Sequence, residues 1–134
     1  YAAPAKLRKG LAALKAGDWA GAFKNFPQDA GYAGDKPYFV SEYGGIWWNP
    51  DGDAAAWGYG QRPRSKEEFL DRYAALTQTL LGNPDICAFC YTQLTDVEQE
   101  VNGLYTYDRR PKFDPAIIRR INTKKAAIET EPAE

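Results

Sequence analysis

Two short runs of consecutive apolar residues mark the middle of the chain. They are residues 37–42, Pro-Tyr-Phe-Val-Ser-Glu, and residues 86–91, Ile-Cys-Ala-Phe-Cys-Tyr. Neither run has the alternation of polar and apolar positions seen in a half-buried strand, and such runs are typical of strands buried on both faces of a parallel sheet. The pattern therefore predicts two strands that each need strands beside them and covering layers on both sides.

Three helices are predicted around these strands. Leucines recur on one face of residues 4–16, which begin with a proline suited to a first helical turn. Residues 65–81 give the strongest pattern, because Ser65 and Glu68 have the spacing of a capping box and an apolar stripe follows them. An Asp-Pro pair at 114–115 begins the last helix. The residues of that segment expected to face inward are Ile117, Ile118, Ile121 and Ile128.

The order strand, long loop, helix occurs twice, which predicts an α/β fold with a parallel sheet. Such a sheet is either doubly wound or closed as a (β/α)₈ barrel, and two strands complete neither. We expect a partial (β/α)₈ TIM barrel, with residues 1–35 as a helix and irregular lead-in, residues 36–129 as the barrel portion and residues 130–134 as a disordered tail. Because the chain has no Met and begins with Tyr1, we expect a fragment or a processed product. Its open strand edges would favour self-association or association with the remainder of the barrel.

Composition and charge exclude several classes of function. Seventeen basic and eighteen acidic residues give a net charge of -1, which does not favour binding to nucleic acid. No apolar run reaches the roughly 18 residues that a membrane-spanning helix needs. The absence of His removes His-based triads and most catalytic zinc sites, so we expect neither a metal nor a cofactor.

Cys87 and Cys90 are three residues apart in a predicted strand, where their side chains should point to opposite faces. We therefore interpret them as buried free thiols rather than as a redox pair or a metal site. Free thiols are typical of a soluble protein in a reducing compartment such as the cytoplasm.

Glu42 is the leading candidate for a catalytic residue. It ends a predicted strand, and catalytic groups of barrel enzymes lie at the carboxyl ends of the strands. The long loop that follows contains Trp47, Trp48 and Trp57, and aromatic faces of this kind stack on sugar rings. A carboxylate beside them suits cleavage of a glycosidic bond. The alternatives are a Glu paired with an Arg at the mouth of the strand, and tryptophans that cover the barrel mouth.

Two motifs carry a resemblance to a known family. Residues 38–45, Tyr-Phe-Val-Ser-Glu-Tyr-Gly-Gly, resemble the nucleophile strand of family 2 glycoside hydrolases, which include bacterial β-galactosidases and β-glucuronidases. Residues 90–104 (Cys-Tyr-Thr-Gln-Leu-Thr-Asp-Val-Glu-Gln-Glu-Val-Asn-Gly-Leu) and 107–112 (Tyr-Asp-Arg-Arg-Pro-Lys) resemble the last barrel strand and the following loop of the same enzymes. The similarity covers roughly residues 36–129 and occurs in the expected order.

The resemblance implies that the chain forms the last two βα units of the barrel, with strands seven and eight. Glu42 would then be the nucleophile of a retaining hydrolase, acting on a carbohydrate such as a β-linked galactoside or glucuronide. Tyr91 and Gln93 would face the pocket, unless they serve only for packing and a loop hydrogen bond. The family's acid/base residue is the Glu of an Asn-Glu pair, and no such pair occurs in this chain. The chain alone is therefore expected to be inactive.

The charged residues after the second strand are expected to be structural. Asp96, Glu98 and Glu100 alternate with valines as on the solvent face of a hairpin, with a turn at residues 102–103, and are not expected to replace the missing acid. The basic residues 109–112 are interpreted as a solvated turn or as a partner for acidic loops.

Two other functions stay open at this point. The chain could be a non-catalytic carbohydrate-binding or interaction module that uses its Trp-rich loop, or a piece that only docks with the rest of its barrel. The sequence around Glu42 favours the enzyme over the binding module. The missing Asn-Glu pair favours the docking role for the isolated chain.

Overall fold

Two parallel strands lie side by side at the centre of the chain, in a computed structural model that describes residues 2–18, 36–49, 52 and 54–130. Strand β1 spans Tyr38–Gly44 and strand β2 spans Ile86–Thr92. Tyr38 pairs with Ile86 at one end and Gly44 pairs with Thr92 at the other. The register is irregular in two places, between Tyr38 and Phe39 and between Val40 and Tyr43. The described part is therefore a mixed α/β structure with a small parallel sheet, as predicted.

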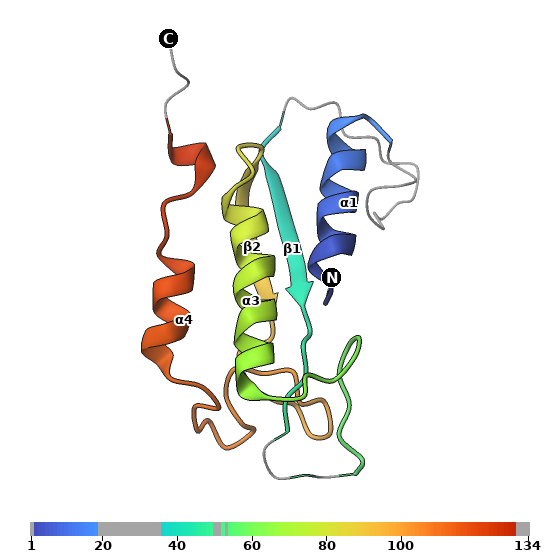
Figure 1. The fold of residues 1–134 in the computed structure, drawn as a ribbon, viewed down its shortest axis with the longest axis vertical. Helices are drawn as coiled ribbons and strands as arrows, with labels where there is room; N and C mark the ends of the chain where they lie inside the picture. Colours follow the sequence, from blue (N-terminus) through green and yellow to red (C-terminus); the bar gives the residue numbers. More distant parts are fainter. Residues whose placement is uncertain (1, 19–35, 50–51, 53, 131–134) are drawn as a thin grey trace.

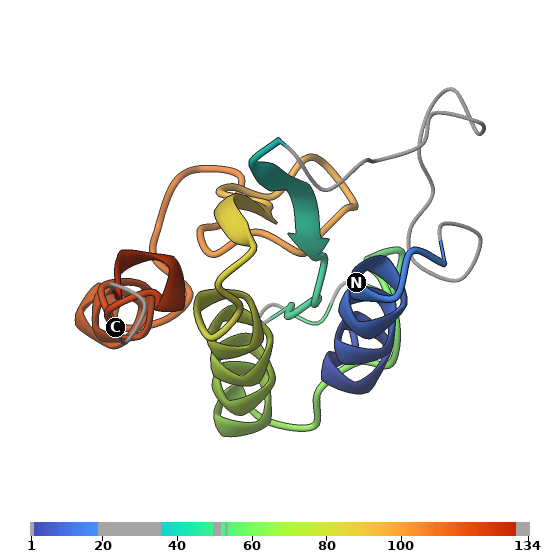
Figure 2. The same cartoon turned by 90° about the horizontal axis from the view of Figure 1, so that it is seen from above.

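Helices cover one face of this sheet (Figures 1 and 2). Helix α3 lies in the middle, helix α1 flanks it on the side of β1, and helix α4 flanks it on the other side. The helices span Pro4–Lys15 (α1), Lys66–Leu81 (α3) and Pro115–Asn122 (α4), and a short 3-10 helix spans Ala127–Glu129. The predicted lead-in between α1 and β1 falls mostly on residues 19–35, and the predicted tail falls mostly on residues 131–134; both ranges lie outside the described residues.

Helices α3 and α4 begin at the capping residues that the sequence predicts. The hydroxyl oxygen of Ser65 accepts a hydrogen bond from the amide of Glu68 at 3.1 Å, and the Glu68 carboxylate accepts one from the amide of Arg64 at 2.8 Å. These bonds satisfy amides at the start of α3 that have no partner within the helix. At α4, the Asp114 carboxylate accepts a hydrogen bond from the amide of Ala116 at 2.9 Å.

One hydrophobic core joins all these elements. Leu7 of α1 and Phe69 of α3 are fully buried, and both belong to the cluster that contains residues of β1, β2 and α4. The core residues are Leu7, Leu11, Val40, Tyr43, Ile46, Phe69, Tyr73, Leu76, Leu80, Ile86, Phe113 and Ile121. Helix α1, which the sequence analysis placed in a lead-in, is therefore part of the same packed body.

The prediction that both faces of the strands are buried is wrong for this chain. Phe39 is 54% exposed, and Ser41, Glu42, Cys87 and Cys90 are exposed as well. The helices bury only the side chains that point toward them, so the rest of each strand stays open. Cys87 and Cys90 are free, as predicted, but they are not buried.

Two further expectations, one for Ile128 and one for the turn after β2, are also wrong. Ile128 is 44% exposed, because α4 ends at Asn122 and the chain continues into a separate 3-10 helix. The tight turn after β2 is closed by reciprocal backbone hydrogen bonds between Val97 and Glu100, not at residues 102–103. Asn102 is instead fully buried.

Candidate functional site

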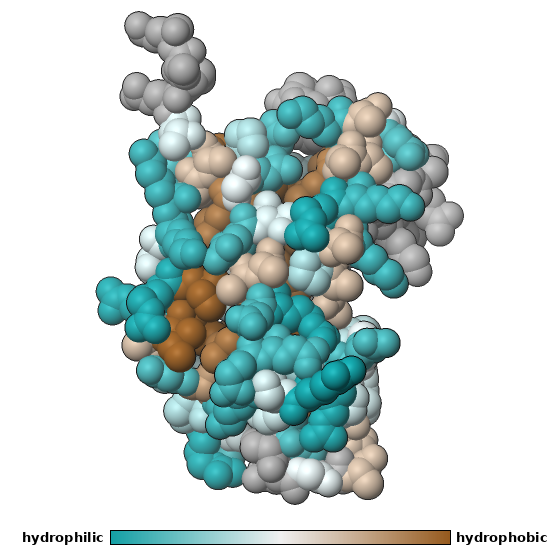
Figure 3. Space-filling model, viewed as in Figure 1, coloured by the Kyte–Doolittle hydropathy of each residue, from teal (hydrophilic) through white to brown (hydrophobic). Residues whose placement is uncertain are grey.

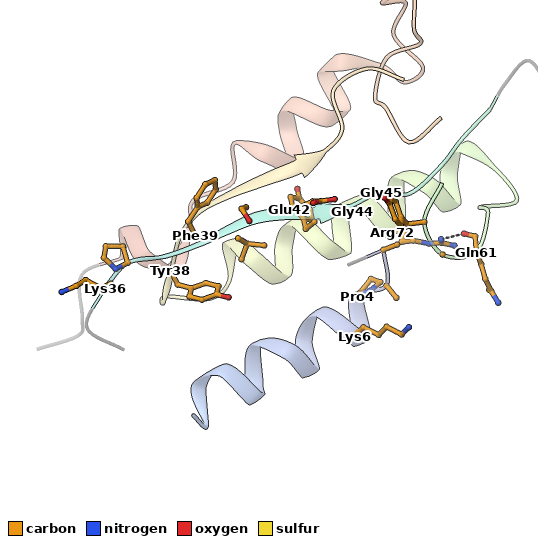
Figure 4. A pocket seen from close by; sticks show the side chains of 18 residues that line it. Pro4, Lys6, Lys36, Tyr38, Phe39, Glu42, Gly44, Gly45, Gln61 and Arg72 are labelled. Atoms are coloured by element: carbon orange, nitrogen blue, oxygen red, sulfur yellow. Dashed lines mark hydrogen bonds between the residues drawn. The ribbon is translucent and has the colours of Figure 1, made fainter. Parts of the chain in front are cut away.

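Glu42 lies near the carboxyl end of β1, where the long loops after both strands gather at the lower end of the molecule (Figure 1). Its side chain is exposed and lines a cleft of about 1340 Å³ (Figure 4). The cleft follows β1 along its length and is bounded by the start of α1, by residues 59–61 and by Arg72. The strand that carries Glu42 is thus one wall of this cleft.

Glu42 is the one carboxylate among the described residues that line this cleft. The cations there are Lys6, Lys36 and Arg72, and the Arg72 guanidinium donates a hydrogen bond to the carbonyl of Gln61 at 2.6 Å. A single carboxylate can attack an electrophile or accept a proton, but retaining hydrolysis of a glycoside needs two carboxyl groups. The described lining of the cleft therefore lacks the second carboxyl group that such a reaction would need.

Gly44 and Gly45, which follow Glu42 after Tyr43, let aromatic rings pack against the backbone. Gly44 and Gly45 have φ angles of 95° and 66°, a region that residues with a side chain rarely adopt. A Cβ atom on Gly44 would lie 2.2 Å from the Tyr91 ring, and one on Gly45 would lie 2.6 Å from the Tyr59 ring. The amide of Gly45 also donates to the carbonyl of Thr92 at 2.7 Å. The backbone after Glu42 is therefore fixed against β2 and against residue 59.

Tyr91 does not line the cleft. Its ring packs edge-on against Tyr43 and Tyr73, with centroid distances of 5.5 and 4.9 Å, and its hydroxyl donates a hydrogen bond to the carbonyl of Asn102 at 3.4 Å. Burial raises the pKa of Tyr91, so the phenol stays protonated in neutral water. The structure shows core packing and a loop hydrogen bond for this residue.

Gln93 follows a cis peptide bond to Thr92 and is half-buried. Its backbone is held from both sides, because its amide donates to the carbonyl of Asn102 and its carbonyl accepts from the amide of Leu104. The side-chain nitrogen Nε2 is buried without a hydrogen-bond partner among the described residues. Like Tyr91, Gln93 is absent from the lining of the Glu42 cleft.

The three tryptophans have different surroundings. Trp47 is half-buried, its indole donates to the carbonyl of Gly60 at 3.4 Å, and the Arg62 guanidinium lies 5.4 Å from its ring centroid. Trp48 packs against the hydrophobic core. Trp57 is 46% exposed and meets Tyr59 edge-to-face, with ring centroids 5.8 Å apart. None of the tryptophans lines the cleft itself, and Trp57 approaches it through Tyr59.

A buried ion pair joins the loops at this end of the sheet. The Lys112 ammonium lies 2.6 Å from Oδ1 of Asp96, and it also donates to the carbonyls of Trp48 and Val101 at 2.8 and 3.0 Å. Oδ1 of Asp96 accepts a further hydrogen bond from the amide of Gly103 at 2.9 Å. These partners of Lys112 come from both long loops, so its ammonium group ties the loop after β1 to the loop after β2.

The expectation that Asp96 lies on a solvent face is therefore wrong. The chain turns at 98–99, which directs Asp96 inward toward Lys112. Glu98 is exposed, and Glu100 is half-buried and accepts a hydrogen bond from the side-chain amide of Asn102 at 3.1 Å. The alternative interpretation, in which the basic residues 109–112 pair with an acidic loop, is correct for Lys112, which pairs with Asp96.

Several residues of the cleft were not identified from the sequence. Tyr59 lies in the same loop as the tryptophans, between Gly58 and Gly60, and an aromatic residue between two glycines is itself a signal of close packing. No local sequence pattern marks the other cleft residues Lys6, Gln61 and Arg72. They reach the cleft because α1 and the start of α3 pack beside β1, which depends on the tertiary structure.

No protein-family model matches the chain, and no curated protein matches it in sequence. Within the described ranges, no three His, Cys, Asp or Glu side chains come together as a metal site would require, and no helix there is long and apolar enough to cross a membrane.

The close approach at Gly44 leads to a testable prediction. Gly44→Ala should lower the free energy of unfolding by more than Gly52→Ala does, because both positions have positive φ but only Gly44 would bring a Cβ atom into the Tyr91 ring. The measurement is chemical denaturation of the two variants. Equal losses of stability would show that the Tyr91 ring does not constrain the backbone after Glu42.

Proposed function

We propose that this chain supplies the nucleophile, Glu42, of a retaining glycoside hydrolase resembling family 2. The observation that carries the proposal is the position of Glu42. Its carboxylate is exposed in a large cleft, near the carboxyl end of a parallel strand, at the end of the sheet where the long aromatic loop gathers. Active sites of barrel enzymes occur at this end of their strands.

The arrangement of the helices supports a partial barrel as the architecture. In a (β/α)₈ barrel the helices form an outer ring and the inner faces of the strands point to the axis. Here α1, α3 and α4 lie on one face of the sheet, and Phe39 and Glu42 are exposed. We infer that β1 and β2 are strands seven and eight. Helix α1 then has the place of the helix that precedes strand seven, because it packs beside α3 on the flank of β1.

In the proposed reaction the Glu42 carboxylate attacks the anomeric carbon of a β-linked glycoside. The bond from that carbon to the leaving-group oxygen breaks, and a second carboxyl group protonates the oxygen. Water then attacks the glycosyl ester and releases Glu42, with the second carboxyl group acting as base. That second group must lie about 5 to 5.5 Å from Glu42. No other carboxylate lines the described part of the cleft, so the acid/base residue belongs to another part of the barrel.

The isolated chain should therefore not hydrolyse nitrophenyl β-galactoside or nitrophenyl β-glucuronide. The assay is release of nitrophenol by the purified 134-residue chain, compared with its Glu42→Gln variant. Turnover by the chain that disappears in the variant would overturn the partial-barrel proposal, because it would require an acid/base residue within this chain.

The proposed partner of the chain is the remainder of the barrel, and self-association is the expected behaviour without it. Strand β1 pairs with β2 alone among the described strands, so each strand has an open edge that can accept another strand. Cys87 and Cys90 lie on β2, and both are exposed in this state.

Thiol chemistry provides a direct measure of this open state. Cys87 and Cys90 should both react with a thiol-specific disulfide reagent in the native chain, and they should be protected when the remaining strands assemble on the sheet. Absorbance of the released thiolate measures both reactions. Two protected thiols in a native monomer would show that the chain covers its own strands and needs no partner.

A non-catalytic carbohydrate-binding module is the second candidate, and the exposed Trp57 favours it. The two functions differ in what they require of Glu42. A binding module should retain its affinity for sugar and all its biological activity in Glu42→Gln, whereas the proposed hydrolase should lose turnover in that variant.

A further inference from the structure

We propose that Ser41 is a second polar group of the Glu42 site, and that its hydroxyl binds the sugar hydroxyl next to the carbon that Glu42 attacks. This role rests on the proposed function, whereas the geometry beneath it can be tested separately. Ser41 directly precedes Glu42 in β1, and both residues are exposed and line the same cleft (Figure 4). A regular strand would direct two neighbouring side chains to opposite faces.

A bulge in β1 brings the two side chains to one face. From Val40 to Tyr43, β1 advances by three residues, while the paired segment of β2 advances by two. One extra residue therefore lies between Val40 and Tyr43, which makes this segment a β-bulge. Val40 and Tyr43 are 6% and 1% exposed and both belong to the hydrophobic core, although residues three apart in a regular strand point to opposite faces. The two residues between them are left on the open side.

Contacts on both sides of the bulge hold it in place. The hydroxyl groups of Tyr43 and Thr77 share a hydrogen bond at 2.8 Å, which joins β1 to α3. The Tyr43 ring also meets the rings of Phe89 and Tyr91 edge-on, with a centroid distance of 5.5 Å to each. Val40 packs into the same core, so the strand is anchored before and after the bulge. The bulge is therefore a fixed part of the fold.

Strand β2 contains a matching bulge near its start. Tyr38 pairs with Ile86, but the next residue of β1 pairs with Ala88, so β2 has one extra residue there. The two extra residues cancel, and the strands end in the register in which they begin. The bulge in β2 also accounts for the exposure of both Cys87 and Cys90, which a regular strand would direct to opposite faces. In both strands, the bulge thus exposes side chains that a regular alternation would separate.

The chemistry of the two neighbouring groups is complementary. In the proposed reaction the Glu42 carboxylate attacks the anomeric carbon, and the ring carbon beside it carries the 2-hydroxyl group of the sugar. The Ser41 hydroxyl can donate or accept a hydrogen bond, so it can bind a sugar hydroxyl in either orientation. Hydrogen bonds to the 2-hydroxyl strengthen in the transition state of glycoside hydrolysis. The contact to this group is therefore assigned to Ser41.

Thiol labelling of the 134-residue chain tests the bulge. Cys87→Ser and Cys90→Ser together leave the chain without its own two thiols. In that background Ser41→Cys and Glu42→Cys should react with a thiol-specific disulfide reagent at similar rates, because both side chains are exposed. Val40→Cys is the buried control and should react at least about tenfold more slowly, because a buried thiol reacts only after local opening. A Ser41→Cys or Glu42→Cys chain that is folded by circular dichroism and reacts as slowly as Val40→Cys would overturn the proposal.

Kinetics of the complete barrel enzyme test the contact with substrate. Ser41→Ala should lower kcat/KM for an aryl β-glycoside by about tenfold, the range expected for one hydrogen bond. For the matching 2-deoxy glycoside, which lacks the hydroxyl, the same variant should leave kcat/KM unchanged. Ser41→Thr keeps a hydroxyl at this position and should retain activity on both substrates. Equal losses on the two substrates, or no loss on either, would overturn the contact.

Failure of this contact and failure of the proposed function give different results. If Ser41→Ala affects both substrates equally while Glu42→Gln is inactive, the contact is removed and the nucleophile stays. If Glu42→Gln retains kcat, the nucleophile and the contact that rests on it are both removed. The labelling rates of the Ser41→Cys and Glu42→Cys chains decide the bulge in either case.

Discussion

Replacement of Glu42 by Gln should lower kcat by several orders of magnitude in the complete barrel enzyme that we propose. The amide keeps the shape of the side chain but cannot form the glycosyl ester, so the covalent step is lost. Folding should survive, because Glu42 is exposed and the substitution leaves its backbone in β1 unchanged. The measurement is hydrolysis of an aryl β-glycoside at saturating substrate.

Glu98→Gln is the control for this experiment. It makes the same chemical change at an exposed carboxylate on the loop after β2, outside the lining of the Glu42 cleft. Its kcat should equal that of the original enzyme. A loss of activity in Glu98→Gln as large as that in Glu42→Gln would show that the effect comes from charge on the molecule and not from a nucleophile.

Lys112→Met should destabilise the chain by about 3–5 kcal/mol, which is the usual cost of removing one partner from a buried ion pair. The side chain of Lys112 is fully buried, and its ammonium bonds Asp96 and two backbone carbonyls. The variant leaves the Asp96 carboxylate buried without its cation. Denaturation with urea, followed by tryptophan fluorescence, measures the change and also reports on the loop of Trp47 and Trp48.

Arg110→Met is the matched control for the buried pair. Arg110 and Asp108 also form an ion pair, at 2.7 Å, but both side chains are more than half exposed. Loss of an exposed pair should cost less than about 1 kcal/mol. Adding Asp96→Asn to Lys112→Met should recover part of the lost stability, because it removes the uncompensated carboxylate. Equal effects of Lys112→Met and Arg110→Met would contradict the role of Lys112 in joining the two loops.

The elements of the fold could be predicted because their signals are local. The helix predicted over 4–16 is observed over Pro4–Lys15, and the one predicted over 65–81 is observed over Lys66–Leu81. A proline at a first turn and a capping serine act within a few residues, so the sequence around them contains the information. Both apolar runs are strands, and the observed strands extend one or two residues further at their carboxyl ends.

The burial of individual side chains could not be predicted in the same way. Cys87 and Cys90 occur in an apolar strand, yet they are exposed, because the layer that would cover them is not formed by the described residues. Asp96 has the alternation of a surface residue, but Lys112 lies sixteen positions away in the sequence and reaches it through a loop. Such pairs depend on how the loops fold against each other.

The residues of the candidate site also differ in whether a local sequence pattern or a tertiary contact determines their position. Glu42 could be identified because it ends an apolar run and lies just before Tyr43 and a pair of glycines. The position of Tyr59 in the cleft depends on a backbone contact with Gly45 that no local pattern reports. Conversely, Tyr91 and Gln93 were assigned to the pocket by resemblance, and the structure places both among packing and backbone contacts.

Covalent trapping of Glu42 tests the central claim most directly. The reagent is a dinitrophenyl fluoroglycoside, whose leaving group departs without protonation and whose fluorine slows breakdown of the glycosyl ester. Incubated with the complete barrel enzyme and digested, the protein should carry one fluoroglycosyl group on the peptide that contains Glu42, as measured by mass spectrometry. The Glu42→Gln variant should carry none. A label on another carboxylate, or an active enzyme that acquires no label, would contradict the account.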